Sequence, residues 1–158
     1  MKRSSLPRSA GPKRKTRLRA RKADPAKECK WLCRRLVVEL RDQNTCQRCG
    51  ASSERSQIHW AHVKNRGAKS LVCAPWASLA LCAGCHFWFD AHKGSITNPG
   101  DGMKWWIEKF PERAVRLSFW NHQRNRPKIN YSIEKLWLEQ ELAQYGIPLP
   151  AAPKKRYA

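Results

Sequence analysis

Apolar side chains recur every three to five positions between residues 27 and 42, and this spacing predicts an amphipathic helix. Its apolar positions are Trp31, Leu32, Leu36, Val37 and Leu40. The polar run at residues 43–45 predicts where it ends. Cys29 and Cys33 lie one helical turn apart on it, either as extra metal ligands or as buried small hydrophobes. We favour burial, because free cysteine is among the most buried residue types.

Two more helical patterns follow in the C-terminal half. The first has apolar residues at Trp105, Trp106, Ile107, Phe110, Ala114, Leu117 and Trp120. Pro111 interrupts it and is expected to end or kink the helix, because proline lacks a backbone N–H. In the second pattern Ser132 is predicted to cap a helix that runs through Leu142 and stops at Gly146.

The chain divides into four predicted segments. Residues 1–26 hold 10 of the Lys and Arg residues and almost no large apolar group, which predicts a disordered basic arm. A central domain over residues 27–122, a helical extension over 123–150 and a basic tail over 151–158 follow. We interpret the arm, including Arg14, Arg17 and Arg19, as a phosphate clamp rather than a solubility or targeting segment.

Charge points to a polyanionic partner. The chain carries 32 Lys and Arg against 12 Asp and Glu, a net charge of +20, which exceeds what solubility requires. Nucleic acid is the expected partner, with double-stranded or branched DNA favoured and RNA as a variant. A membrane is the weaker rival, because no run of about 18 apolar residues exists and the segment after Met1 does not resemble a signal peptide.

The 7 cysteines include two C-x-x-C pairs, Cys46 with Cys49 and Cys82 with Cys85. This pattern predicts a metal site in a reducing compartment, hence a cytoplasmic protein. Four thiolates suit a structural Zn²⁺ ion, which contributes to folding directly. Redox cysteines and an iron–sulfur cluster are the alternatives. A zinc deaminase is excluded, because its H-x-E and P-C-x-x-C motifs are missing.

Histidines lie between and directly after the cysteine pairs. The order C-x-x-C, then Ala61-His62-Val63, then C-x-x-C followed by His86 resembles the small zinc-containing HNH endonucleases of phages and prophages. The resemblance covers about Arg41 to His92. It implies an α+β fold in which a small, zinc-stapled ββα-metal core is flanked by helices. The cytoplasm would then be that of a bacterial host.

The resemblance also implies a site and an activity. His62 matches the general base of the family, and His86 matches the helix-borne ligand of a catalytic Mg²⁺ or Mn²⁺ ion. Asp90 follows four residues later, where some members place a further ligand. Together these residues imply metal-dependent hydrolysis of phosphodiester bonds in DNA.

Two positions depart from the family pattern. Ala61 stands where the family often has a metal ligand, and His59 is the nearest substitute. Ala77 stands where an asparagine usually orients the base. These departures favour the alternative function, a non-catalytic zinc-finger DNA-binding protein that serves recombination or packaging. The sequence shows no base-reading helix and no half-site pattern, so it does not predict which DNA sequence would be recognised.

Basic and aromatic residues surround the predicted site. Lys64, Arg66 and Lys69 follow the base and are expected to neutralise phosphates, which positions nucleic acid without reading its sequence. The aromatic run at residues 87–89 suits either base stacking or core packing. We favour core packing, because small domains depend on aromatic burial.

Overall fold

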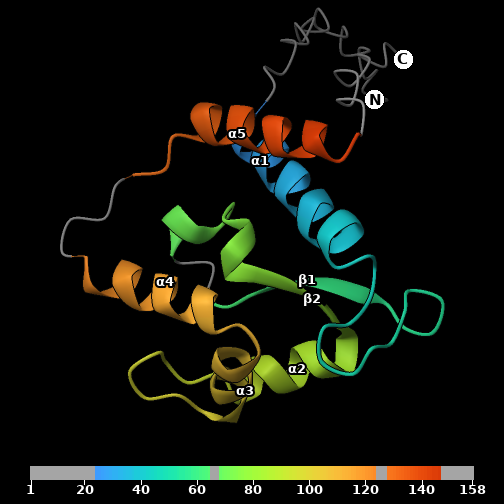
Figure 1. Cartoon of the computed structure of the whole chain (residues 1–158), viewed down its shortest axis with the longest axis vertical. Helices are drawn as coiled ribbons and strands as arrows, with labels where there is room; N and C mark the ends of the chain where they lie inside the picture. The colour runs from blue at the N-terminus through green and yellow to red at the C-terminus, as the bar shows by residue number, and fades with distance from the viewer. Residues whose placement is uncertain (1–23, 65–67, 124–127, 147–158) are drawn as a thin grey trace, which may run out of the picture.

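The computed structural model describes residues 24–64, 68–123 and 128–146, and it combines helices with a small antiparallel sheet. In chain order the elements are α1 (Pro25–Arg34), the π-helix η1 (Arg35–Arg41), β1 (Ile58–His62), the 3-10 helices η2 (Lys69–Leu71) and η3 (Pro75–Ala77), β2 (Ser78–Cys82), α2 (Ala83–Ala91), α3 (Asp101–Lys109), α4 (Pro111–His122) and α5 (Tyr131–Gln144). Figure 1 shows β1 and β2 between the α1–α5 pair and the α2–α3 pair. The α+β class is confirmed at this level.

The predicted N-terminal helix is present and continues without a break into η1. The side chain of Asp24 accepts a hydrogen bond from the Ala26 N–H and caps α1. The predicted end of the helix near residue 42 is also confirmed. Gln43 and Asn44 have positive φ angles of 49° and 52°, and a right-handed helix cannot pass through residues in this conformation. Cys29 and Cys33 are 0% exposed, so the predicted burial of both is confirmed.

The hairpin register decides which strand residues share a face. β1 and β2 pair antiparallel from Ile58 opposite Cys82 to His62 opposite Ser78. Side chains alternate along a strand, so His59 and Ala61 lie on one face and His62 on the other. All residues of β2 are buried, which means that helices and loops cover both of its faces.

Two adjacent charged residues at the end of η1 hold β2 in place. The Asp42 carboxylate accepts a hydrogen bond of 2.8 Å from the Ala80 N–H. The Arg41 guanidinium donates to the Ser78 and Pro75 carbonyl oxygens at 2.8 and 2.7 Å, and it pairs with Asp42. A buried carboxylate is stable here because each charge has both an ionic partner and hydrogen bonds.

The C-terminal helices follow the sequence pattern, with one correction. Phe110 separates α3 from α4, and Pro111 occupies the first turn of α4, as the proline predicted. Helix α5, however, is capped by Asn130 and not by Ser132. The Asn130 side chain accepts hydrogen bonds from the Ser132 and Ile133 N–H groups, so the helix begins one residue before Ser132.

Helix α5 packs across α1. Leu138 and Leu142 are buried between them, and the Lys135 ammonium lies 2.7 Å from the Glu28 carboxylate. None of the helices in the described ranges is both long enough and apolar enough to cross a membrane.

Candidate metal centre

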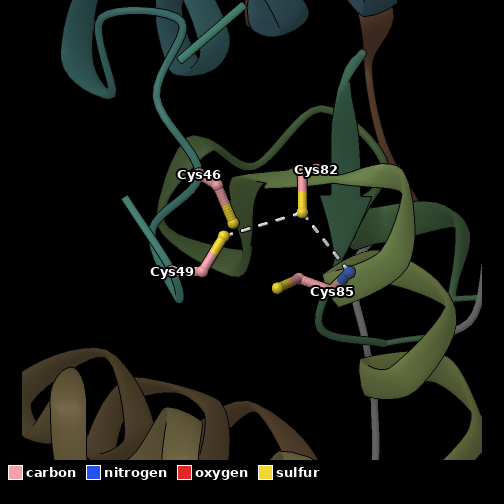
Figure 2. A group of neighbouring side chains, drawn as sticks. All are labelled: Cys46, Cys49, Cys82 and Cys85. Carbon is pink, nitrogen blue, oxygen red and sulfur yellow. Dashed lines mark hydrogen bonds between the residues drawn. The ribbon is translucent and has the colours of Figure 1, made fainter. Parts of the chain in front are cut away.

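Four cysteines from two distant segments converge on one point. Figure 2 shows Cys46 and Cys49, from the turn before β1, facing Cys82 at the end of β2 and Cys85 in the first turn of α2. Their sulfur atoms all lie within 4.8 Å of one another, and those of Cys49 and Cys82 are 3.8 Å apart. Sulfurs bound to one zinc ion at about 2.3 Å would be separated by about 3.8 Å in a tetrahedron. The donor set therefore fits Zn²⁺.

The first cysteine pair sits on a tight turn whose backbone is tied to the sheet. The Cys46 N–H donates to the Ala51 carbonyl, and the Gln47 N–H donates to the Ala80 carbonyl of β2. Gly50, directly after Cys49, has a φ of 75°, which favours glycine over any residue with a side chain. These bonds bring the turn to the end of β2, where the second pair begins.

Electrostatics at the cluster favour a bound cation. Burial raises the pKa of Cys46, but hydrogen bonds from the backbone N–H groups of Cys49, Cys82 and Arg48 outweigh it and lower the pKa to about 7. Burial, together with hydrogen bonds to the other thiols, raises the pKa of Cys85 to about 12 although Arg48 lowers it. Four closely packed thiols resist full ionisation on their own, so a divalent cation would displace their protons.

Arg48 places a positive charge beside the sulfurs. Its guanidinium donates to Cys85 Sγ at 3.7 Å and stacks 3.6 Å from the centre of the Trp88 ring. A zinc ion with four thiolates carries two net negative charges, and this stacked guanidinium is placed to offset part of them. The only sequence signal for this role is that a basic residue lies inside the C-x-x-C pair.

A second group of titratable side chains lies where β1 meets α2. His59 Nδ1 is 3.2 Å from His86 Nδ1, with the two rings nearly perpendicular at 85°. On the other edge of the His86 ring, Nε2 is 3.3 Å from a carboxylate oxygen of Asp90, one turn further along α2. The structure thus brings together three of the residues predicted as ligands of a catalytic ion.

These three residues do not form a metal pocket of the same kind as the cysteines. Within the described ranges, only the four cysteines place three or more ligand atoms within 4.8 Å of one another. His59 and Asp90 contact opposite edges of the His86 ring, which keeps the carboxylate away from His59. His59, His86 and Asp90 form a linear chain of contacts.

A buried lysine extends this chain to the end of β1. Lys93 is 8% exposed, and its ammonium lies 2.7 Å from Asp90 and donates to the His62 carbonyl oxygen at 2.8 Å. The same ammonium is 5.0 Å from the centre of the Phe89 ring. Lys93 therefore fixes the Asp90 carboxylate relative to the hairpin. Sequence reasoning missed it, because no motif marks a lysine at this position.

His62, the predicted general base, lies on the strand face opposite to His59. Its Nε2 atom is 3.3 Å from the Val72 carbonyl oxygen, and its ring centre is 4.2 Å from that of Trp60. Ala77, the position at which the resemblance predicted an asparagine, lies close to His62, because its carbonyl accepts from the N–H of the next residue, Val63, at 2.9 Å. Ala61 is fully buried on the His59 face.

The aromatic run on α2 is only partly core. Phe89 is 0% exposed and Trp88 is half-buried against the core, so the prediction of core packing is confirmed for these two. Phe87 is 80% exposed, and for it the prediction is wrong. Successive helix positions point in directions about 100° apart, so three adjacent aromatic residues cannot all face one core.

Only some of the residues predicted to contact phosphate lie in the described part of the chain. Lys64 donates to the Asn121 side chain at 3.4 Å, and Lys69 is exposed at the start of η2. Arg66 and the arm residues Arg14, Arg17 and Arg19 lie outside the described residues. All 12 acidic residues but only 16 of the 32 Lys and Arg fall within the described ranges, leaving these with +4 of the total +20. Most of the net charge thus resides in the remaining segments.

Comparisons with protein-family models, with curated proteins and with solved structures found no match to this chain.

Proposed function

We propose that this chain is a metal-dependent endonuclease of the HNH type that hydrolyses phosphodiester bonds in DNA. The proposal rests on the contact between His59 of the hairpin and His86 of α2, two elements that are joined at the cysteine cluster. Two imidazole nitrogens of the same kind lie 3.2 Å apart there. The His86 side chain is 21% exposed, so solvent and substrate have access to it.

The distance between these nitrogens suits a shared cation. Two nitrogens bound to one ion at about 2.0–2.1 Å are separated by about 3.0–3.4 Å, depending on the bond angle. We therefore assign His59 and His86 as the residues that would hold the catalytic ion. Because imidazole is a poorer ligand for Mg²⁺ than for transition metals, Mn²⁺ is the better candidate of the two predicted ions.

Asp90 then has a different role from the one that the family resemblance implies. Its carboxylate faces His86 Nε2, the ring nitrogen away from His59. A carboxylate that accepts this N–H fixes the tautomer of the imidazole and makes the other nitrogen a better ligand. Lys93 holds the carboxylate in turn. In this proposal Asp90 orients His86 and does not bind the ion.

The chemistry follows from these assignments. A divalent cation stabilises the charge that develops on the phosphate and on the leaving oxygen. An imidazole close to neutral pKa accepts a proton from the attacking water. His62 is the proposed base on the strength of the family resemblance.

Incubation of the purified chain with supercoiled plasmid tests the proposal. We expect nicking in Mn²⁺, weaker nicking in Mg²⁺ and none in buffer without added divalent ion. Chelation by EDTA is a poor control here, because it also removes zinc. The absence of nicking with every divalent ion tested, from a folded protein that holds zinc and binds DNA, would contradict it.

A non-catalytic DNA-binding module is the second candidate. Two observations favour it: Ala61 and Ala77 replace side chains that the family uses, and only the cysteines form a complete metal pocket in the part of the chain described. Such a protein would serve recombination or packaging by binding alone. The plasmid assay separates the two candidates.

DNA affinity should depend strongly on salt, and most of this dependence should come from the basic arm. Each phosphate contact adds about 0.9 to the slope of log affinity against log salt on duplex DNA. Deleting residues 1–23, the part of the arm (residues 1–26) that precedes the α1 cap Asp24 and carries all 10 of its cations, should reduce the slope by several units and leave zinc content unchanged. Fluorescence anisotropy across a salt series measures it. An unchanged slope would show that the arm is not a clamp.

A further inference from the structure

Phe87 is the most exposed large apolar side chain in the described part of the chain. It is 80% exposed, whereas its neighbours Trp88 and Phe89 are half-buried and buried. A single exposed apolar residue is ordinary on a protein surface. Phe87 differs in its place, because it directly follows His86 of the proposed site.

The helix face around Phe87 is made of small residues and one acidic residue, Asp90. Ala83, Gly84 and Ala91 lie on the same exposed side of α2, at helical spacing from Phe87. A side chain at Gly84 would meet no atom within 4 Å, so internal packing does not require glycine there. Asp90 is 54% exposed, but its carboxylate is paired with the Lys93 ammonium at 2.7 Å. The rest of the outer face of α2 is smooth around one protruding aromatic ring, and a large partner can approach it closely.

We infer that Phe87 inserts between adjacent base pairs of duplex DNA bound across the outer face of α2. This inference rests on the proposed nucleic-acid function. The net charge of +20 attracts a polyanion to the protein, and apolar side chains such as phenylalanine act as wedges that partly unstack base steps. A platform for single strands would need a row of exposed aromatic residues, and α2 has one.

Such insertion would deepen the role of α2. A ring inserted beside His86 would bend the duplex locally and hold one backbone phosphate near the two imidazoles. The contact reads no base edge, so it would favour easily unstacked steps, such as pyrimidine–purine steps, over a fixed sequence. Insertion of Phe87 would therefore make the protein prefer DNA that is easily deformed, although its sequence predicts no base-reading element.

Phe119 provides a matched control. It is the same residue type, it is 73% exposed, and it lies on α4. The full chain, with Phe87→Ala, Phe87→Trp and Phe119→Ala variants, is titrated onto a duplex that carries 2-aminopurine at several steps, without added divalent ion. Anisotropy measures affinity, and 2-aminopurine fluorescence reports unstacking.

We expect wild-type protein to raise the 2-aminopurine fluorescence, and Phe87→Ala to abolish the rise and weaken binding about tenfold. Phe87→Trp should retain both signals, and Phe119→Ala should match wild type. Unchanged fluorescence and affinity in Phe87→Ala would overturn the inference while the DNA-binding function stands. Equal losses in the two alanine variants would also overturn it. Wild-type protein that does not bind the duplex would remove the proposed function itself.

Discussion

Replacing Cys85 by Ser is expected to unfold the central part of the chain. A structural zinc ion contributes about 10–16 kcal/mol to the folding of small zinc domains, which equals or exceeds the total stability of about 5–15 kcal/mol of a typical domain. The cysteine cluster joins the turn after η1 to the junction of β2 and α2, and its loss leaves both segments without that connection. Circular dichroism and metal analysis measure the outcome.

Cys33→Ala is the matched control for this variant. Cys33 is also a fully buried cysteine, but it is not a member of the four-cysteine cluster. Its replacement should lower Tm by a few degrees, as a small core truncation does, and leave one zinc ion bound per chain. If Cys85→Ser keeps its zinc and melts like Cys33→Ala, the cluster is not a structural metal site.

His86→Ala should reduce plasmid nicking by at least a hundredfold while the protein stays folded. The substitution removes one of the two nitrogens assigned to the ion and leaves Asp90 paired with Lys93, which keeps the carboxylate neutralised. Loss of a single electrostatic group in an active site commonly costs a factor of about 10²–10³ in rate. His92→Ala is the matched control, because His92 ends the same helix and its exposed ring contacts Trp88, through the Trp88 carbonyl at 2.9 Å and by stacking on the Trp88 ring.

Two further histidine variants identify the base. His59→Ala and His62→Ala each remove an imidazole, and a lost general base costs a factor of about 10²–10⁴. If His62 is the base, both variants lose activity, but the apparent affinity for Mn²⁺ falls only in His59→Ala. Full activity of His62→Ala would contradict the assignment of His62 as the base. Full activity of His86→Ala would refute the site as a whole.

The parts of the structure that could be predicted from the sequence depend on residues that are close to one another along the chain. Helical spacing and Pro111 predicted α1, α3 and α4, because backbone geometry repeats over a few residues. The two C-x-x-C pairs predicted the cysteine cluster, because four thiols at this spacing match the ligand set of a tetrahedral structural metal site. Such signals need no knowledge of which distant segments meet.

The contacts of the histidines could not be predicted, because they depend on strand register. With Ile58 opposite Cys82, His59 meets α2 and His62 lies on the other face. A slip of one residue would exchange the two faces. The sequence holds a histidine at both kinds of position, so periodicity alone cannot choose between them. The contact of the Lys93 ammonium with the His62 carbonyl oxygen depends on where the hairpin lies against α2, whereas its pairing with Asp90, three residues earlier, is local.

The exposure of Phe87 escaped sequence reasoning for a related reason. Three adjacent aromatic residues suggest burial by composition, but a helix that packs on one side buries only some of them. Asn130, in place of Ser132, shows the same limit on a smaller scale. Both residue types make good caps, and the extended backbone at Asn130 selects between them.

The separation of the two cysteine pairs bears on how the chain folds. Cys49 and Cys82 enclose 32 residues, among them β1 and the whole connection to β2. The entropy lost in closing a flexible loop grows as about (3/2)RT ln n, and contacts between distant residues make folding slow. A zinc ion that binds the first cysteine pair and then the second would close this loop before the strands align, and the free energy of zinc binding would offset the entropy lost. Refolding rates should therefore rise with free zinc concentration until capture is no longer the slow step.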